Sequence, residues 1–134
     1  MIGLDSNVLI RYIVRDDEAQ AKAATNLIEG YCTADAPGFV NVIVMCEIVW
    51  VLGTGYGYDR ATVASVIREM LTSVELQIEE SESVWQALRA FEAGGPDFAD
   101  CLIGIHNKSR QAETTYTFDT AAAKTSGFTL VGDS

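Results

Sequence analysis

The chain has 134 residues, of which 49% are hydrophobic and 21% charged, as expected for one ordinary globular domain over 1–134. Its 19 acidic side chains outnumber its 9 basic ones, and the formal net charge of −10 argues against binding of nucleic acid through a broad basic face. Nucleic acid as such is not excluded, because a bound divalent cation can reverse the local field at an acidic site.

The cysteines and the apolar runs predict the cellular compartment. Cys32, Cys46 and Cys101 are an odd number of thiols without CxxC spacing, which predicts buried free thiols in a reducing compartment. The first predicted strand begins at residue 1, so we expect no signal peptide ahead of it. Glu47 interrupts the longest apolar run, so we expect no membrane span and a cytoplasmic protein.

Strands and helices alternate along the chain. Apolar or alternating runs predict strands at 1–4, 39–40, 75–78, 114–118 and 128–131. Helical periodicity predicts helices at about 8–13, 16–31, 42–52, 59–74, 81–91 and 98–109, with a short one after 119. Asn41, Asp59 and Ser81 are the expected caps of three of these helices. Alternation of this kind predicts an α/β protein with a parallel sheet and helices on both faces.

Asp5 stands where the first predicted strand changes into the first predicted helix. An aspartate at this position is a common helix N-cap, which is the simplest interpretation of the residue. Ligands of open parallel α/β sheets bind outside the carboxyl ends of the strands, where Asp5 would also lie. Asp119 repeats this placement after the predicted strand at 114–118. Each aspartate is therefore either a cap or part of a site.

Glu47 is the only charged residue of the apolar helix predicted at 42–52. Carboxylates are almost never fully buried unless they are paired. Glu47 therefore lies on a narrow solvated stripe, pairs with a cation or binds a metal. The sequence leaves these three interpretations open.

Asp97 and Asp100 lie three residues apart and share one face of the helix predicted at 98–109, together with Gly104 and Asn107. Asp97 could simply cap this helix, whereas Asp100 lies between Ala99 and Cys101 and is harder to explain by structure alone. A glycine inside a helix costs about 1 kcal/mol relative to alanine, so Gly104 predicts the close approach of another group.

The scattered acids are more informative together than singly. Carboxylates gathered in one place repel and raise one another's pKa unless a divalent cation neutralises them. Oxygen ligands suit Mg²⁺ or Mn²⁺ and do not suit zinc. Because Mg²⁺ keeps waters and favours phosphate oxygens, the predicted reaction is metal-assisted hydrolysis of a phosphodiester.

The pattern of these acids, in order over the whole chain, resembles the PIN-domain ribonucleases, and most of all the VapC-type toxins of toxin–antitoxin pairs. The resemblance rests on Asp5-Ser6-Asn7, Glu47 in Glu-Ile-Val-Trp-Val-Leu, Asp97-Phe-Ala-Asp100-Cys-Leu-Ile-Gly, and Thr117-Phe118-Asp119. It implies a three-layer α/β fold with a five-stranded parallel sheet in the order 3-2-1-4-5. It also implies a Mg²⁺- or Mn²⁺-dependent endoribonuclease that dimerises and is inhibited by a small antitoxin protein.

The resemblance also implies roles for individual residues. Asp5, Glu47, Asp100 and Asp119 match the four acids of the family's metal site, and Asp97 is an additional acid that many relatives carry. Ser6, Asn7 and Thr117 take supporting places. We consider Arg11 and Arg15 as phosphate contacts but prefer solvated charges, and we expect His106 to be structural or exposed. The strongly acidic charge leaves few basic residues to guide RNA.

Other classes of protein fit the sequence less well. A phosphoryl-accepting receiver module shares the size and an acidic Mg²⁺ pocket, but it would need paired acids after its first strand and a lysine after its fifth. Ser6 and Asn7 follow Asp5 instead, and no lysine follows 128–131. An Asp-nucleophile phosphatase would need an aspartate where Asn7 stands. A PIN nuclease of RNA processing, or a catalytically silent PIN scaffold, remains an alternative within the same fold.

Overall fold

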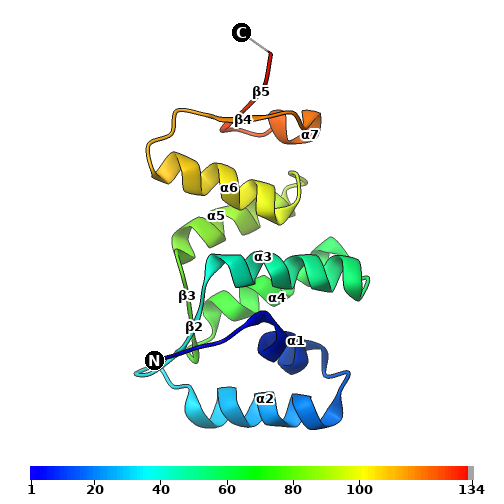
Figure 1. Cartoon of the computed structure of the whole chain (residues 1–134), viewed down its shortest axis with the longest axis vertical. Helices are drawn as coiled ribbons and strands as arrows, with labels where there is room; N and C mark the ends of the chain where they lie inside the picture. The colour runs from blue at the N-terminus through cyan, green and yellow to red at the C-terminus, as the bar shows by residue number, and fades with distance from the viewer. Residues whose placement is uncertain (133–134) are drawn as a thin grey trace. The chain divides into compact units, whose positions relative to one another are not determined.

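A computed structural model describes residues 1–132 and shows an α/β chain. Along the chain the described elements are β1 (Ile2–Gly3), α1 (Ser6–Val14), α2 (Glu18–Tyr31), β2 (Gly38–Val40), α3 (Val42–Trp50), the π-helical turn η1 (Val51–Gly55), α4 (Arg60–Thr72), β3 (Leu76–Ile78), α5 (Ser81–Glu92), α6 (Phe98–Ser109), β4 (Thr115–Thr117), α7 (Thr120–Ala123) and β5 (Phe128–Leu130) (Figure 1). The chain forms two compact units, Met1–Ser81 and Glu82–Ser134.

The first unit is built around a parallel three-stranded sheet in the order β1-β2-β3. Gly38 pairs with Ile2 on one side and with Leu76 on the other. A Cβ atom at Gly38 would lie 2.5 Å from Leu4 Cδ1, so glycine lets the β1 chain approach β2. α1 packs against α2 and α3, and α4 packs against β3 (Figure 1). The core between these elements is almost wholly aliphatic and includes Leu9, Val40, Met45, Ile48, Leu52 and Ile67.

Side-chain caps set the starts of the helices in the first unit. Asp5, Asp17, Asn41 and Asp59 each accept a hydrogen bond from the backbone N–H three residues further on. The predictions for Asn41 and Asp59 are therefore confirmed. The prediction for Ser81 is wrong, because this residue is already the first residue of α5. The helix predicted at 42–52 ends as an α-helix at Trp50 and continues as η1.

The second unit contains a parallel pair of strands, β4 and β5, which α6 and α7 contact. Its core lies largely on α5 and α6, where the rings of Phe91 and Phe98 meet edge to face with centroids 6.2 Å apart. Gly104 is buried in α6, and a Cβ atom there would lie 2.5 Å from Phe128 Cε2. The close approach predicted at Gly104 is thus explained by a ring of β5.

The observed topology agrees with parts of the predicted strand order. The sheets β1-β2-β3 and β4-β5 match the 3-2-1 and 4-5 parts, but the described strands form two sheets and not one of five strands. Pairing of β1 with β4 stays a prediction. All three cysteines are free, as predicted; Cys32 and Cys101 are buried and Cys46 is half-buried. Among residues 1–132, no helix is both long and apolar enough to cross a membrane.

Candidate functional site

The five predicted acidic ligands are divided between the two units. Asp5 and Glu47 belong to the first unit, and Asp97, Asp100 and Asp119 belong to the second. Within residues 1–132, no three His, Cys, Asp or Glu side chains form a group that could hold a metal ion. A single site made by all of these acids therefore stays a prediction.

Asp5 lies at the carboxyl end of β1, where the chain turns into α1. Buried Leu4 donates its N–H to the carbonyl of Phe39 at 2.9 Å, which holds this end of the strand against β2. Asp5 Oδ1 accepts the N–H of Val8 at 3.1 Å and caps α1. The side chain is exposed, and its second oxygen, Oδ2, makes no hydrogen bond within the described residues. Asp5 is therefore a cap that keeps one oxygen available for another ligand.

Glu47 lies on an exposed stripe of α3 and not in the core. Ile43 and Trp50, on the same side of the helix, have 69% and 66% of their surface exposed. Within the first unit, Glu47 has no ion-pair or hydrogen-bond partner, so pairing with a cation of this unit is excluded. For this unit the interpretations that remain are a solvated stripe and a metal ligand. α3 packs against α1, the helix that Asp5 caps.

Asp97 and Asp100 occupy the first turn of α6 and have different environments. Asp97 is exposed, and its Oδ1 caps the helix by accepting the N–H of Asp100 at 2.9 Å. Asp100 is half-buried. Its partial burial raises the pKa of the Asp100 carboxyl, and the charge of Asp97, a hydrogen bond with Asp97 and the charge of Asp119 add to the shift. Asp97 and Asp119 are therefore both close enough to act on Asp100.

Asp119 follows β4 and caps the short helix α7. Its Oδ1 accepts the N–H groups of Ala121 at 2.8 Å and Ala122 at 3.2 Å. The hydroxyl oxygen of Thr117 accepts the N–H of Asp119 at 3.0 Å, which fixes the turn between strand and helix. Thr117 thus fixes the backbone at Asp119, and its supporting role at a site stays a prediction. As at Asp5, the second carboxylate oxygen makes no hydrogen bond within residues 1–132.

The donor set fits a hard divalent cation. All five side chains are carboxylates, and each of the three capping aspartates uses only Oδ1 for its helix. Mg²⁺ and Mn²⁺ prefer oxygen ligands and are commonly bound by one or two carboxylates with waters. Asp100 holds its proton more tightly than an ordinary aspartate, and a nearby cation would favour the ionised form instead.

The other predicted site residues lie in different surroundings. Ser6 is half-buried, and Asn7 is exposed with no side-chain hydrogen bond among the described residues. Arg15 is the C-cap residue of α1, at the opposite end from Asp5, and its guanidinium donates to Thr25 Oγ1 at 2.8 Å. Arg15 is therefore not placed beside Asp5. His106 lies in the last turn of α6.

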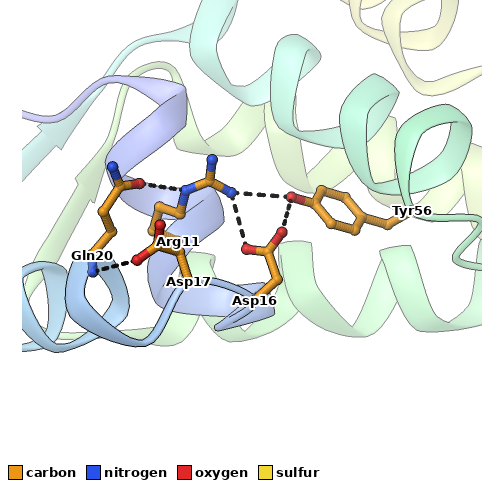
Figure 2. A network of polar contacts seen from close by, with 5 residues as sticks. All are labelled: Arg11, Asp16, Asp17, Gln20 and Tyr56. Atoms are coloured by element: carbon orange, nitrogen blue, oxygen red, sulfur yellow. Dashed lines mark hydrogen bonds and ion pairs between the residues drawn. The ribbon is translucent and has the colours of Figure 1, made fainter.

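Arg11 is held in a polar network that the sequence did not reveal (Figure 2). Its Nη1 donates to Asp16 Oδ1 at 2.9 Å and to the Tyr56 hydroxyl at 3.2 Å, and its Nε donates to Gln20 Oε1 at 2.7 Å. Tyr56 donates to Asp16 Oδ2 at 2.8 Å. The hydrogen bond from Tyr56 and the charge of Arg11 lower the pKa of Asp16. Arg11 and Asp16 are therefore partly exposed charges that form an ion pair with each other.

Asp5 and Asp119 each follow a strand of a parallel pair in this α/β chain, and ligands of open parallel α/β sheets bind outside such strand ends. The family model of the PIN domain matches residues 2–127, and the chain belongs to the PIN domain family. PIN domains are generally nucleases, and they typically use divalent metal ions. The match favours the nuclease prediction over the receiver-like alternative. Comparisons with curated proteins and with solved structures gave no match.

Proposed function

We propose that this chain is a Mg²⁺- or Mn²⁺-dependent endoribonuclease and the toxin of a toxin–antitoxin pair. The observation that carries the proposal is that Asp100 is half-buried in the first turn of α6 and that the charges of both Asp97 and Asp119 act on its carboxyl. Asp5 has the same placement after β1 that Asp119 has after β4, and both keep a free oxygen. Membership of the PIN domain family, whose members are generally nucleases, supports a shared role of these acids in metal-dependent cleavage.

In this proposal Asp5, Glu47 and Asp100 hold the cation, directly or through waters, and Asp119 completes the site or orients the attacking water. The cation, when bound, supplies a water of lowered pKa and neutralises charge on the phosphate oxygens. The chain's residues contribute position: Asp97 and Thr117 fix the backbone at Asp100 and Asp119. Attack in line with the leaving oxygen would yield a 5′-phosphate and a 3′-hydroxyl.

The acids themselves can be tested by paired substitutions. Asp5→Asn and Asp100→Asn should abolish Mn²⁺-dependent cleavage of RNA while the far-UV circular dichroism spectrum is retained. Asp59→Asn is the matched control, because Asp59 also caps a helix, by accepting the N–H of Thr62 at 2.8 Å, but belongs to no part of the site. Full activity of either site variant, or equal loss in Asp59→Asn, would contradict the assignment.

The toxin role, the homodimer and the antitoxin are parts of the same proposal, as is action in the cytoplasm. Exposed large apolar side chains support a partner, among them Tyr31 at 74%, Ile43 at 69% and Trp50 at 66% exposure. A small antitoxin encoded beside this chain should co-purify with it and suppress its activity. A monomer in sedimentation at micromolar concentration would contradict the dimer. An active enzyme without any such neighbour would favour the alternative of a PIN nuclease of RNA processing.

A further inference from the structure

A hollow of about 350 Å³ lies beside Asp5, wholly within the first unit. α1 and α2 form it, with Asp5, Asn7, Arg11 and Gln20 supplying polar groups and Val8 and Ala24 among its apolar surfaces. A flat apolar ring could lie against these side chains while its edge meets the polar ones. The hollow is therefore a candidate for the part of the substrate next to the reacting phosphate, if Asp5 acts as proposed above.

The network around Arg11 fixes the orientation of Gln20. An arginine guanidinium has donors and no acceptor, so the Gln20 atom that faces Arg11 Nε at 2.7 Å must be the oxygen, Oε1. The amide nitrogen Nε2 consequently points away from the guanidinium with both of its hydrogens (Figure 2). The Gln20 backbone is also held, because its N–H donates to Asp17 Oδ1 at 3.0 Å.

Arg11 keeps a second donor group for a ligand. Its Nε and Nη1 are used by Gln20, Asp16 and Tyr56, whereas Nη2 makes no hydrogen bond within residues 1–132. In Figure 2, Nη2 of Arg11 and Nε2 of Gln20 lie on the same side of the network, away from the Asp16 carboxylate. The guanidinium cannot turn without breaking its ion pair with Asp16. Two groups of residues that line the hollow are thus fixed as donors before any ligand binds.

We propose that this hollow binds a guanine base of the RNA, with Arg11 and Gln20 donating to the O6 and N7 atoms of its Hoogsteen edge. The inference rests on the proposed function for the substrate class. Single-stranded RNA exposes base edges that proteins read by hydrogen bonds, and a cationic side chain across O6 and N7 is a frequent contact to guanine. Adenine presents an amino group in place of O6, so a donor would face a donor. Cytosine also has adjacent acceptors, but its smaller ring covers less of the apolar surface.

The proposal can be tested without metal and without catalysis. Guanosine 5′-monophosphate is titrated into the isotopically labelled full chain in EDTA, and the side-chain resonances of Gln20 Nε2 and Arg11 Nε are followed by NMR. We expect both resonances to shift, with at least about tenfold tighter binding than for adenosine 5′-monophosphate or the 7-deazaguanine analogue. The same titration with cytidine 5′-monophosphate tests the preference for a purine.

The sharpest variant is Gln20→Glu, which preserves the size of the side chain and its acceptor for Arg11 but removes the amide donors. It should lose the preference for guanine while the resonances of Tyr56 stay unchanged. Gln77→Glu adds the same charge at an exposed position of β3 and should bind like the unaltered chain. Equal binding of the guanine and adenine nucleotides, equal or tighter binding of the cytosine nucleotide, or an unaltered preference in Gln20→Glu would overturn the proposal.

Failure of this inference is distinguishable from failure of the proposed function. Cleavage of RNA in Mn²⁺ with no guanine preference in EDTA would remove the base-binding hollow and leave the nuclease. A guanine preference that depends on Gln20 in a chain that cleaves no RNA would support the hollow and contradict the nuclease.

Discussion

The carboxylate of Asp97 accepts the backbone N–H of Asp100 at 2.9 Å, so one predicted metal ligand fixes the backbone of the other. Asp97 is exposed and satisfies the start of α6, while Asp100 is half-buried and carries the raised pKa. Two acids that the sequence places on one helix face thus have unequal surroundings. The difference predicts unequal roles: Asp100 binds the cation, and Asp97 positions Asp100.

The first prediction compares substitutions at these two residues. Asp97→Asn should lower Mn²⁺-dependent cleavage by about 10–100-fold, as for other groups that orient a ligand, because asparagine still caps a helix. Asp100→Asn should lower it much further, because an oxygen ligand loses its charge. Rates measured on one RNA at saturating Mn²⁺ test the order, and unchanged melting temperature of Asp97→Asn serves as the control. Reversed severities would mean that the ligand roles are exchanged.

The second prediction concerns the contact between Gly104 and Phe128. Gly104→Ala would place a Cβ atom 2.5 Å from Phe128 Cε2, so the ring must move. Overpacking costs about 1–3 kcal/mol, whereas alanine regains about 1 kcal/mol of helix propensity, so we expect net destabilisation of about 1 kcal/mol. Denaturant unfolding measures it. Gly30→Ala is the matched control, because its Cβ would meet nothing within 4 Å and should stabilise α2 slightly. Equal effects at both glycines would contradict the steric explanation.

Gly104 also shows what the sequence could and could not predict. A glycine inside a helix predicted a close neighbour. That neighbour is the ring of Phe128, which lies 24 positions after Gly104 in the sequence. Local features were predictable: the helix predicted at 98–109 has those bounds, and the cap Asn41 depends on a residue three positions away. The partner of a side chain in another element depends on packing, which a single sequence does not encode locally.

The same limit applies to the candidate site. The positions of Asp5 and Asp119 between a strand and a helix could be predicted, because the change from strand to helix is a local feature of the sequence. The hydrogen bond from Arg11 to Tyr56 joins residues 45 positions apart, and no periodic pattern in the sequence predicts it. A local pattern likewise predicts each strand but not which strand lies beside it. The joining of β1 to β4 accordingly stays a prediction, although the sheets β1-β2-β3 and β4-β5 have the expected internal orders.

The third prediction concerns Tyr12, whose hydroxyl donates to Glu29 Oε2 at 2.7 Å. This hydrogen bond, with desolvation and the charge of Glu29, raises the pKa of Tyr12 to about 12 from 10.0. Because the folded state holds the proton more tightly, the stabilisation is fully present below pH 10 and is lost between about pH 10 and 12. Solvent screening limits it to about 1 kcal/mol.

Two measurements check the Tyr12 prediction. The free energy of unfolding should fall more steeply from pH 10 to 11 for the unaltered chain than for Tyr12→Phe, which has no hydroxyl to ionise. Tyr31→Phe is the control, because Tyr31 is 74% exposed and should leave the slope unchanged. The same slope in all three chains would show that the contact with Glu29 contributes nothing in solution.

The last prediction is that a divalent cation stabilises the fold. Partial burial raises the pKa of Asp100, and the charges of Asp97 and Asp119 raise it further, so a cation that neutralises these acids should remove an unfavourable interaction from the folded state. A cation that binds the native acids but not the unfolded chain adds about 2.7 kcal/mol at a hundredfold excess over Kd. For a chain of this size the melting temperature should rise by about 5–10 °C in millimolar Mn²⁺.

The variants make this last prediction specific. Asp100→Asn should melt higher than the unaltered chain in EDTA, because one repelling charge is gone, and should gain less from Mn²⁺. Asp59→Asn should gain as much as the unaltered chain, because Asp59 caps α4 outside the site. Ca²⁺ should stabilise without supporting cleavage, since its larger and looser shell misplaces the attacking water. Identical melting in EDTA and in Mn²⁺ would show that these acids do not act as one cation site, and the proposed nuclease would then rest on family membership alone.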